Sequence, residues 1–206
     1  MHGVNACDVP EGSLLAEFGG PQDYRDCFYR DVPGEVSLPQ FIERFYCSAA
    51  FRPERAVLRL LGTPAREADA RALARGESDR FGAWKLVERR SANGSGLVAE
   101  HGPTGSARAE AKSKTQLAKG HLQGRPQARE GRGKRSEALL HSKDTNTASW
   151  FAIEPLQSSS SKAIGQTKTR TRLLFGSWVG NLEQSGWRSL QAAHVWYSKV
   201  LLGGVC

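Results

Sequence analysis

Three ionisable residues of this chain could act as acid and base within apolar surroundings. Glu88 and Glu154 each follow tryptophan in a short strand-like stretch, and His194 lies on the apolar face of a helical pattern. A buried, unpaired carboxyl group has a raised pKa, so either glutamate near His194 could transfer a proton. The simpler interpretation is that Glu88 pairs with Arg89 or Arg90 at the surface and that His194 is a hydrogen-bonded core residue. No pattern in the sequence identifies a catalytic residue.

The same residues indicate a binding site that needs no catalysis. A pocket for a small apolar molecule needs aromatic walls and a few polar groups that orient the guest. The residues from which we expect such a site are Trp84, Glu88, Trp150, Glu154, His194 and Tyr197. The tryptophans can equally be core residues, because large aromatic side chains bury much apolar surface.

Two glycine-rich stretches match phosphate-binding loops only in part. Residues 94–99 (GSGLVA) fit a loose dinucleotide fingerprint, but polar residues precede them where a buried strand is required, and Pro103 follows where a helix should run. Residues 131–136 (GRGKRS) lack the earlier glycine and the adjacent Lys-Ser of a phosphate loop. We therefore expect no nucleotide and no other cofactor.

The cysteines and histidines give no metal-binding pattern. The four cysteines are too far apart to form the close pairs of a zinc site: Cys7, Cys27, Cys47 and Cys206. We expect reduced thiols, of which Cys27 and Cys47 have apolar neighbours and behave as small hydrophobes. Three evenly spaced histidines share no repeated neighbours: His101, His121 and His141. We expect no metal.

The net charge of +8 is concentrated in two stretches. Residues 91–148 hold ten Lys and Arg against five Asp and Glu, and residues 157–172 hold four basic residues and no acidic one. Clustered Lys and Arg bind phosphates whatever the base sequence, but no aromatic side chains for base stacking are interleaved with them. We expect no specific nucleic-acid partner. An interaction protein that retains RNA through these stretches remains an alternative.

The first part of the chain predicts one strand, three helices and a second strand. Residues 24–32 are strand-like and stop at a Pro-Gly turn. Ser37 and Gln40 have the spacing of a capping box for a helix that follows. Further helices are expected over 53–62 and 65–75, the second of them mostly exposed and ended by Gly76.

The rest of the chain predicts three strands and a C-terminal helix. Residues 81–89 read as a strand with Trp84, Leu86 and Glu88 on one face. Residues 149–154 and 172–179 are also strand-like, and 187–202 place apolar residues at helical spacing.

Two polar stretches interrupt this pattern. Residues 91–148 and 157–171 hold no aromatic side chain and consist largely of small and polar residues. They cannot bury enough apolar surface to offset the entropy of ordering them, so we predict that both are disordered inserts. They are either long loops or translated non-coding sequence.

The ordered blocks resemble a group of uncharacterised bacterial domains. The similar residues are 45–48 (FYCS), 51–55 (FRPER), 81–88 (FGAWKLVE), 149–155 (SWFAIEP), 171–177 (TRLLFGS) and 194–202 (HVWYSKVLL). That group is similar to the helix-grip (SRPBCC, START-like) superfamily, which also holds lipid-transfer domains and polyketide cyclases. The resemblance implies an antiparallel sheet around a long C-terminal helix, enclosing a small apolar ligand without catalysis. A cyclase- or hydrolase-type enzyme of the same fold is the alternative.

The expected organisation is one α+β domain in which residues 1–90 and 149–206 form two halves. The first insert lies where the resembling domains have a strand hairpin, so the sheet would be incomplete. No stretch approaches the roughly 20 apolar residues of a membrane span, and no signal peptide is visible. We therefore expect a soluble, cytoplasmic protein. Its oligomeric state does not follow from the sequence.

Overall fold

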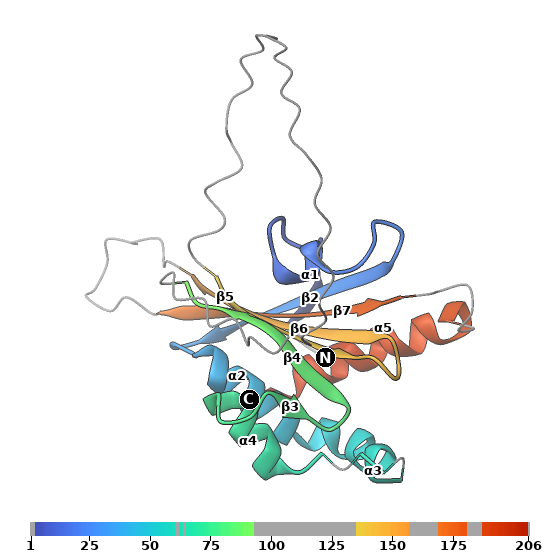
Figure 1. The fold of residues 1–206 in the computed structure, drawn as a ribbon. Coiled ribbons are helices and arrows are strands. Elements are labelled where there is room, and N and C mark those ends of the chain that lie inside the picture. Colours follow the sequence, from blue (N-terminus) through green and yellow to red (C-terminus); the bar gives the residue numbers. More distant parts are fainter. Residues whose placement is uncertain are drawn as a thin grey trace, which may run out of the picture.

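Seven strands in the described residues form one antiparallel sheet, and helices lie on both of its faces (Figure 1). The computed structural model describes residues 3–60, 62–63, 65–92, 135–156, 169–180 and 187–205, of which 187–190 are described by their backbone only. The predicted α+β class, the antiparallel sheet and the C-terminal helix are confirmed.

The sheet has the strand order β1-β2-β7-β6-β5-β4-β3. The strands are β1 (Val4–Ala6), β2 (Tyr24–Pro33), β3 (Arg80–Phe81), β4 (Trp84–Arg90), β5 (Ser136–Ser142), β6 (Thr147–Leu156) and β7 (Arg170–Val179). Strands β4 to β7 are consecutive neighbours, and β2 pairs with β7 from Tyr24↔Val179 to Pro33↔Arg170. The predicted strand at 81–89 is divided between β3 and β4, and the other predicted strands are present.

The described residues form five α-helices and one 3-10 helix. They are α1 (Leu14–Glu17), α2 (Leu38–Cys47), the 3-10 helix η1 (Ala49–Phe51), α3 (Arg52–Leu60), α4 (Glu67–Arg75) and α5 (Trp187–Gly203). The capping box of α2 is present, with Ser37 and Gln40 each accepting the other's backbone N–H. Gly76 ends α4 with a φ of 78°, the left-handed conformation that glycine favours. Strand β1 and helix α1 were not predicted.

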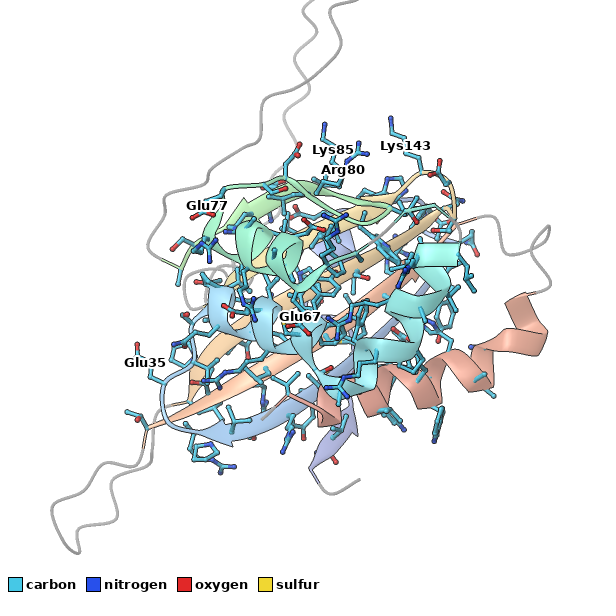
Figure 2. All side chains as sticks on the ribbon, turned by 90° about the horizontal axis from the view of Figure 1, so that it is seen from below. Glu35, Glu67, Glu77, Arg80, Lys85 and Lys143 are labelled. Atoms are coloured by element: carbon cyan, nitrogen blue, oxygen red, sulfur yellow. The ribbon has the colours of Figure 1, made fainter. Side chains whose placement is uncertain are left out.

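The sheet separates two hydrophobic cores. On one face, α2, η1, α3, α4 and α5 cover a core that includes Phe45, Phe151 and Leu202; we call this the helix face. On the opposite face, α1 and the N-terminal segment cover a core around Leu15 and Trp150; we call this the α1 face. Charged side chains, among them those labelled at the rim in Figure 2, project away from both cores.

The prediction that all of 91–148 lies outside the fold is wrong at its C-terminal end. Residues 136–142 form β5, which pairs with β4 on one side and with β6 on the other. Within it, Ala138, Leu139 and Leu140 are buried on both faces of the sheet. The short run of Ala and Leu carried no aromatic signal, which is why the strand was overlooked. The second predicted insert, 157–171, is also wrong at its C-terminal end, because Arg170 and Thr171 belong to β7 and Thr171 is buried. The predicted disorder over 93–134 and 157–168 falls outside the described residues.

A β-bulge in β4 overturns the prediction that Trp84, Leu86 and Glu88 share one face. Leu86 pairs with Leu140, whereas Glu88 pairs with Leu139, so Val87 is an extra residue in β4. Leu140 belongs to the core of the helix face and Leu139 to the core of the α1 face. Because paired residues point to the same face, the bulge moves Glu88 to the α1 face.

Helix α4 is less exposed than predicted. Ala70, Leu73 and Ala74 are buried against the core of the helix face, and α4 packs on α2. The segment has few large apolar residues, and two of its three buried residues are alanines. Its sequence is therefore similar to that of an exposed helix.

Helix α5 lies along β2 and β1, at the opposite edge of the sheet from α4. Arg30 of β2 donates hydrogen bonds to the carbonyl oxygens of Gly203 and Val205, at 2.8 and 3.0 Å. These bonds satisfy carbonyl groups that the end of a helix leaves unpaired and fix the end of α5 on the sheet. Among the described residues, no helix has the length and hydrophobicity required to cross a membrane.

Candidate ligand-binding cavity

A cavity of about 300 Å³ lies on the helix face, between α5, the segment from α2 to α3, and the ends of β6 and β7. Its walls are mostly apolar and include Phe45, Tyr46, Phe51, Glu54, Val57, Leu58, Trp84, Thr147, Ser149, Phe175, Ser177, Trp178, His194, Tyr197, Ser198 and Leu201. Small-molecule sites in proteins have volumes from about 300 Å³ upwards, with aromatic walls and a few polar groups. The cavity is therefore the best candidate for a binding site in the described part of the chain.

Two buried donors on the cavity wall have no hydrogen-bond partner among the described residues. They are the hydroxyl group of Tyr46, on α2, and the indole N–H of Trp84, on β4. Tyr46 as a whole is only 2% exposed, and its ring packs on Phe51 and Phe81. Leaving a buried donor unpaired costs about 1–3 kcal/mol, so two such groups in one cavity wall indicate a place for an acceptor atom.

Glu54, in the first turn of α3, brings a carboxyl group to the cavity wall. Burial raises the pKa of Glu54, although hydrogen bonding to Tyr197 and the charge of His194 act in the opposite direction. Burial likewise raises the pKa of Tyr46 and of Tyr197, and the neighbouring Glu54 carboxylate adds to both shifts. Both phenols therefore remain protonated donors at any physiological pH.

His194 connects α5 to the sheet beside the cavity. Its Nε2 atom lies 3.3 Å from Oδ2 of Asp26, on β2. The other carboxylate oxygen of Asp26 accepts the backbone N–H of Ser177 at 3.0 Å, and the hydroxyl of Tyr24 donates to Oδ2 at 3.1 Å. Burial, with the Asp26 charge, raises the pKa of Tyr24 to about 12. The histidine ring is thus held by a carboxylate that is itself fixed to β7.

The structure brings three of the six predicted site residues together at the cavity: Trp84, His194 and Tyr197. Their role in binding stays a prediction. The other three lie on the α1 face. Glu88 reaches it through the bulge in β4. Trp150 and Glu154 reach it because side chains alternate along β6, whose helix-face residues include Ser149, Phe151 and Ile153.

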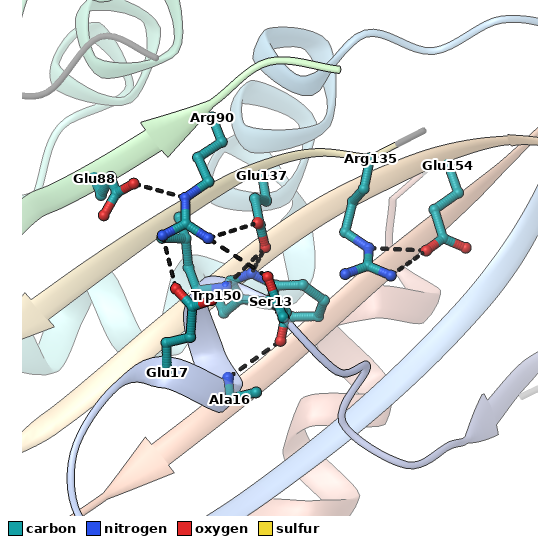
Figure 3. Close-up of polar contacts among 11 residues, drawn as sticks. Ser13, Ala16, Glu17, Glu88, Arg90, Arg135, Glu137, Trp150 and Glu154 are labelled. Carbon is teal, nitrogen blue, oxygen red and sulfur yellow. Dashed lines mark hydrogen bonds and ion pairs between the residues drawn. The ribbon is translucent and has the colours of Figure 1, made fainter. Parts of the chain in front are cut away.

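The three residues on the α1 face already have partners (Figure 3). Oε1 of Glu88 lies 2.6 Å from Nε of Arg90. This ion pair is the one expected if Glu88 has no catalytic role. Glu154 lies 2.8 Å from the guanidinium of Arg135. The indole N–H of Trp150 donates to the carboxylate of buried Glu137 at 2.8 Å. These contacts give all three a structural role in the fold.

Sequence reasoning missed Glu54 and Tyr46, the two cavity residues that carry the most informative polar atoms. A signal for Glu54 was present, since Phe51, Glu54 and Leu58 have the spacing of one helix face. A carboxylate on such an apolar stripe indicates a buried acid. Tyr46 lies on the buried face of α2, and its sequence neighbours could not show that its hydroxyl would lack a partner.

The described residues contain no group of three or more His, Cys, Asp or Glu side chains that could hold a metal ion. Comparison with known protein families, with characterised proteins and with solved structures finds no match for the chain. The assignment of function therefore depends on the cavity itself.

Proposed function

We propose that this protein binds a small, largely apolar molecule in the cavity between α5 and the sheet, in the manner of helix-grip domains. The observation that carries the proposal is the pair of unpartnered donors, Tyr46 and Trp84, in a mostly apolar wall. A guest with carbonyl or similar oxygens would supply the acceptors that these donors lack. The order of elements supports the helix-grip assignment, since strand β2 precedes the helices, the meander follows, and a long helix ends the described chain.

The chemistry of the wall defines the ligand class. Phe45, Phe51 and Phe175 offer apolar ring surface, so the body of the ligand should be hydrophobic. Because Tyr46 stays protonated and has no partner among the described residues, it presents a donor and favours an acceptor on the ligand. A volume of about 300 Å³ suits a compact molecule, such as a short fatty acid or a small aromatic ketone, better than a sterol.

The proposal is tested by a thermal-shift screen of fatty acids, sterols and aromatic polyketides, repeated on two variants of α3. Val57 lines the cavity, whereas Leu60 is 87% exposed and does not line it. We expect Val57→Trp to abolish the stabilisation by a hit and Leu60→Trp to preserve it. Absence of stabilisation by every apolar class, or equal loss in both variants, would reject the proposal.

A catalytic alternative has one specific observation in its favour, which is the raised pKa of Glu54 beside His194. An acid–base enzyme would use this pair in place of Glu88 and Glu154, which are ion-paired on the α1 face. The alternative predicts chemical turnover of a bound ligand that is lost in Glu54→Gln. Recovery of the ligand unchanged after prolonged incubation would favour binding alone.

A further inference from the structure

Two cysteine side chains meet on the α1 face, away from the cavity. Cys7 directly follows β1, and Cys27 lies in β2. Their Sγ atoms are 3.2 Å apart, and the backbone N–H of Cys7 donates to the carbonyl oxygen of Cys27 at 3.0 Å. The antiparallel register, in which Ala6 pairs with Phe28, continues by one residue and places the two cysteines opposite each other.

The geometry points to a redox-active dithiol, in which Cys7 and Cys27 form a reversible disulfide when the protein meets a low-molecular-mass disulfide. Side chains opposite each other in an antiparallel pair have Cβ atoms about 4.5–5.5 Å apart, close to the span of a disulfide. The sulfur atoms have to approach by about 1 Å to reach bonding distance. Strand β1 has only three residues and lies at the edge of the sheet, so a small movement there disturbs little.

The two thiols differ in exposure, and this difference gives them separate roles. Cys7 is half-buried and lines a groove of about 420 Å³ together with Tyr29, Arg135 and Arg172. Cys27 is only 2% exposed. An external disulfide can therefore reach Cys7 but not Cys27, which makes Cys7 the attacking thiol and Cys27 the resolving thiol.

Electrostatics supports the same assignment. The hydrogen bond between the two thiols lowers the pKa of Cys7, more than burial raises it, and the positive charge of Arg172 acts in the same direction as the hydrogen bond. The same hydrogen bond, together with burial, raises the pKa of Cys27. Since the thiolate is the nucleophile, Cys7 reacts first.

The reaction balances without any further reactant. The Cys7 thiolate attacks one sulfur of oxidised glutathione, forms a mixed disulfide and releases one glutathione thiolate. Cys27 then loses its proton to a released thiolate and attacks Sγ of Cys7. The second glutathione leaves, so that two protein thiols are oxidised and one glutathione disulfide is reduced to two thiols.

Cys47 provides an internal comparison. It is half-buried at the end of α2, and burial raises its pKa. No second sulfur contacts it among the described residues. Cys47 can therefore take up at most a mixed disulfide, and it should do so more slowly than Cys7.

The test uses the full chain carrying Cys47→Ser and Cys206→Ser, incubated in glutathione buffers of increasing oxidised fraction, quenched with acid, alkylated and analysed by peptide mass spectrometry. We expect the two cysteine peptides to become cross-linked, with loss of two hydrogen atoms and reversal by dithiothreitol. Adding Cys27→Ala should stop the reaction at a glutathione adduct on Cys7. Adding Cys7→Ser should leave Cys27 unmodified while the protein is folded.

Two results would overturn the inference. One is that both thiols remain open to alkylation, after denaturation, in a fully oxidised buffer. The other is that a glutathione adduct accumulates on Cys7 although Cys27 is present. Circular dichroism of each variant confirms that the compared proteins are folded, and Cys27→Ala is chosen because alanine leaves no buried hydroxyl group.

Discussion

The indole N–H of Trp150 donates to Oε2 of Glu137 at 2.8 Å, and both residues are buried on the α1 face (Figure 3). The same oxygen accepts the backbone N–H of Leu14 at 3.0 Å, and Oε1 lies 3.7 Å from the guanidinium of Arg90. One carboxylate of β5 thereby connects α1, β4 and β6.

Replacing this carboxylate should be strongly destabilising. In Glu137→Ala the buried N–H groups of Trp150 and Leu14 lose their acceptor. The loss should lower the free energy of unfolding by about 3 kcal/mol or more. Glu137→Gln keeps one acceptor oxygen and should cost about 1 kcal/mol. Urea unfolding measures both values. Glu154→Gln, at a more exposed ion pair, is the matched control, and a cost for Glu137→Ala no larger than in this control would contradict the expectation.

The raised pKa of Glu54 predicts a pH dependence of stability. Below about pH 3 the carboxyl group is protonated in both folded and unfolded chains. As the pH rises, the unfolded chain releases its proton first, so the folded state loses relative stability until its own pKa is passed. Glu54→Gln has no such titration and should be more stable than the parent at pH 7, with the difference shrinking as the pH falls towards 4.

Thermal unfolding of both proteins between pH 4 and pH 8 measures this difference. Glu35→Gln is the matched control, because Glu35 is exposed and points into solvent (Figure 2). A constant difference between Glu54→Gln and the parent across the pH range would show that burial of Glu54 has no electrostatic cost.

Tyr46→Phe separates binding from stability. The hydroxyl of Tyr46 is buried without a partner in the described structure, so its removal should leave the free protein equally stable or more stable, by about 1 kcal/mol. The same change should weaken a ligand with an acceptor oxygen about tenfold. Calorimetric titration and urea unfolding give the two values. Tyr29→Phe, on the α1 face, is the control and should not change the affinity for the ligand. A loss of stability in Tyr46→Phe would contradict the absence of a partner for its hydroxyl.

The segment between β4 and β5 should be replaceable. Arg90 pairs with Glu137, and the backbone N–H of Ala92 donates to the hydroxyl of Ser136 at 3.1 Å, so the two strands are already in hairpin register. Substituting Asn-Gly for residues 93–134 gives the two-residue turn that antiparallel strands prefer. We expect an unchanged circular dichroism spectrum and a melting temperature no lower than that of the full chain, because a shorter connection costs less entropy to close. Loss of the sheet would show that the segment takes part in folding.

Local signals in the sequence predicted most of the elements. Ser37 and Gln40 mark the start of α2, and Gly76 marks the end of α4, because caps depend on residues within one turn. Strand β5 escaped prediction because Ala138, Leu139 and Leu140 become recognisable only through their neighbours on β4 and β6. The sequence of so short a segment does not reveal with which strands it will pair.

The candidate site was predictable only in part, for the same reason. Trp84 and His194 were assigned to it from aromatic content and helical spacing, which are local properties. Glu88 was assigned to the wrong face because one extra residue in β4 reverses the alternation of side chains between the two faces. No feature of the sequence around Val87 indicates the bulge. Glu154 was misplaced because the choice between the two faces of β6 depends on which helices cover each face.

Helix α5, which ends at Gly203, contacts β1, which begins at Val4, so the two ends of the described chain lie close together. A short glycine-rich linker from residue 205 to residue 3 would join these neighbours, and fresh termini opened between Ala92 and Arg135 would leave every strand pair intact. The architecture is therefore suited to circular permutation, with the protein starting at β5 and finishing at β4.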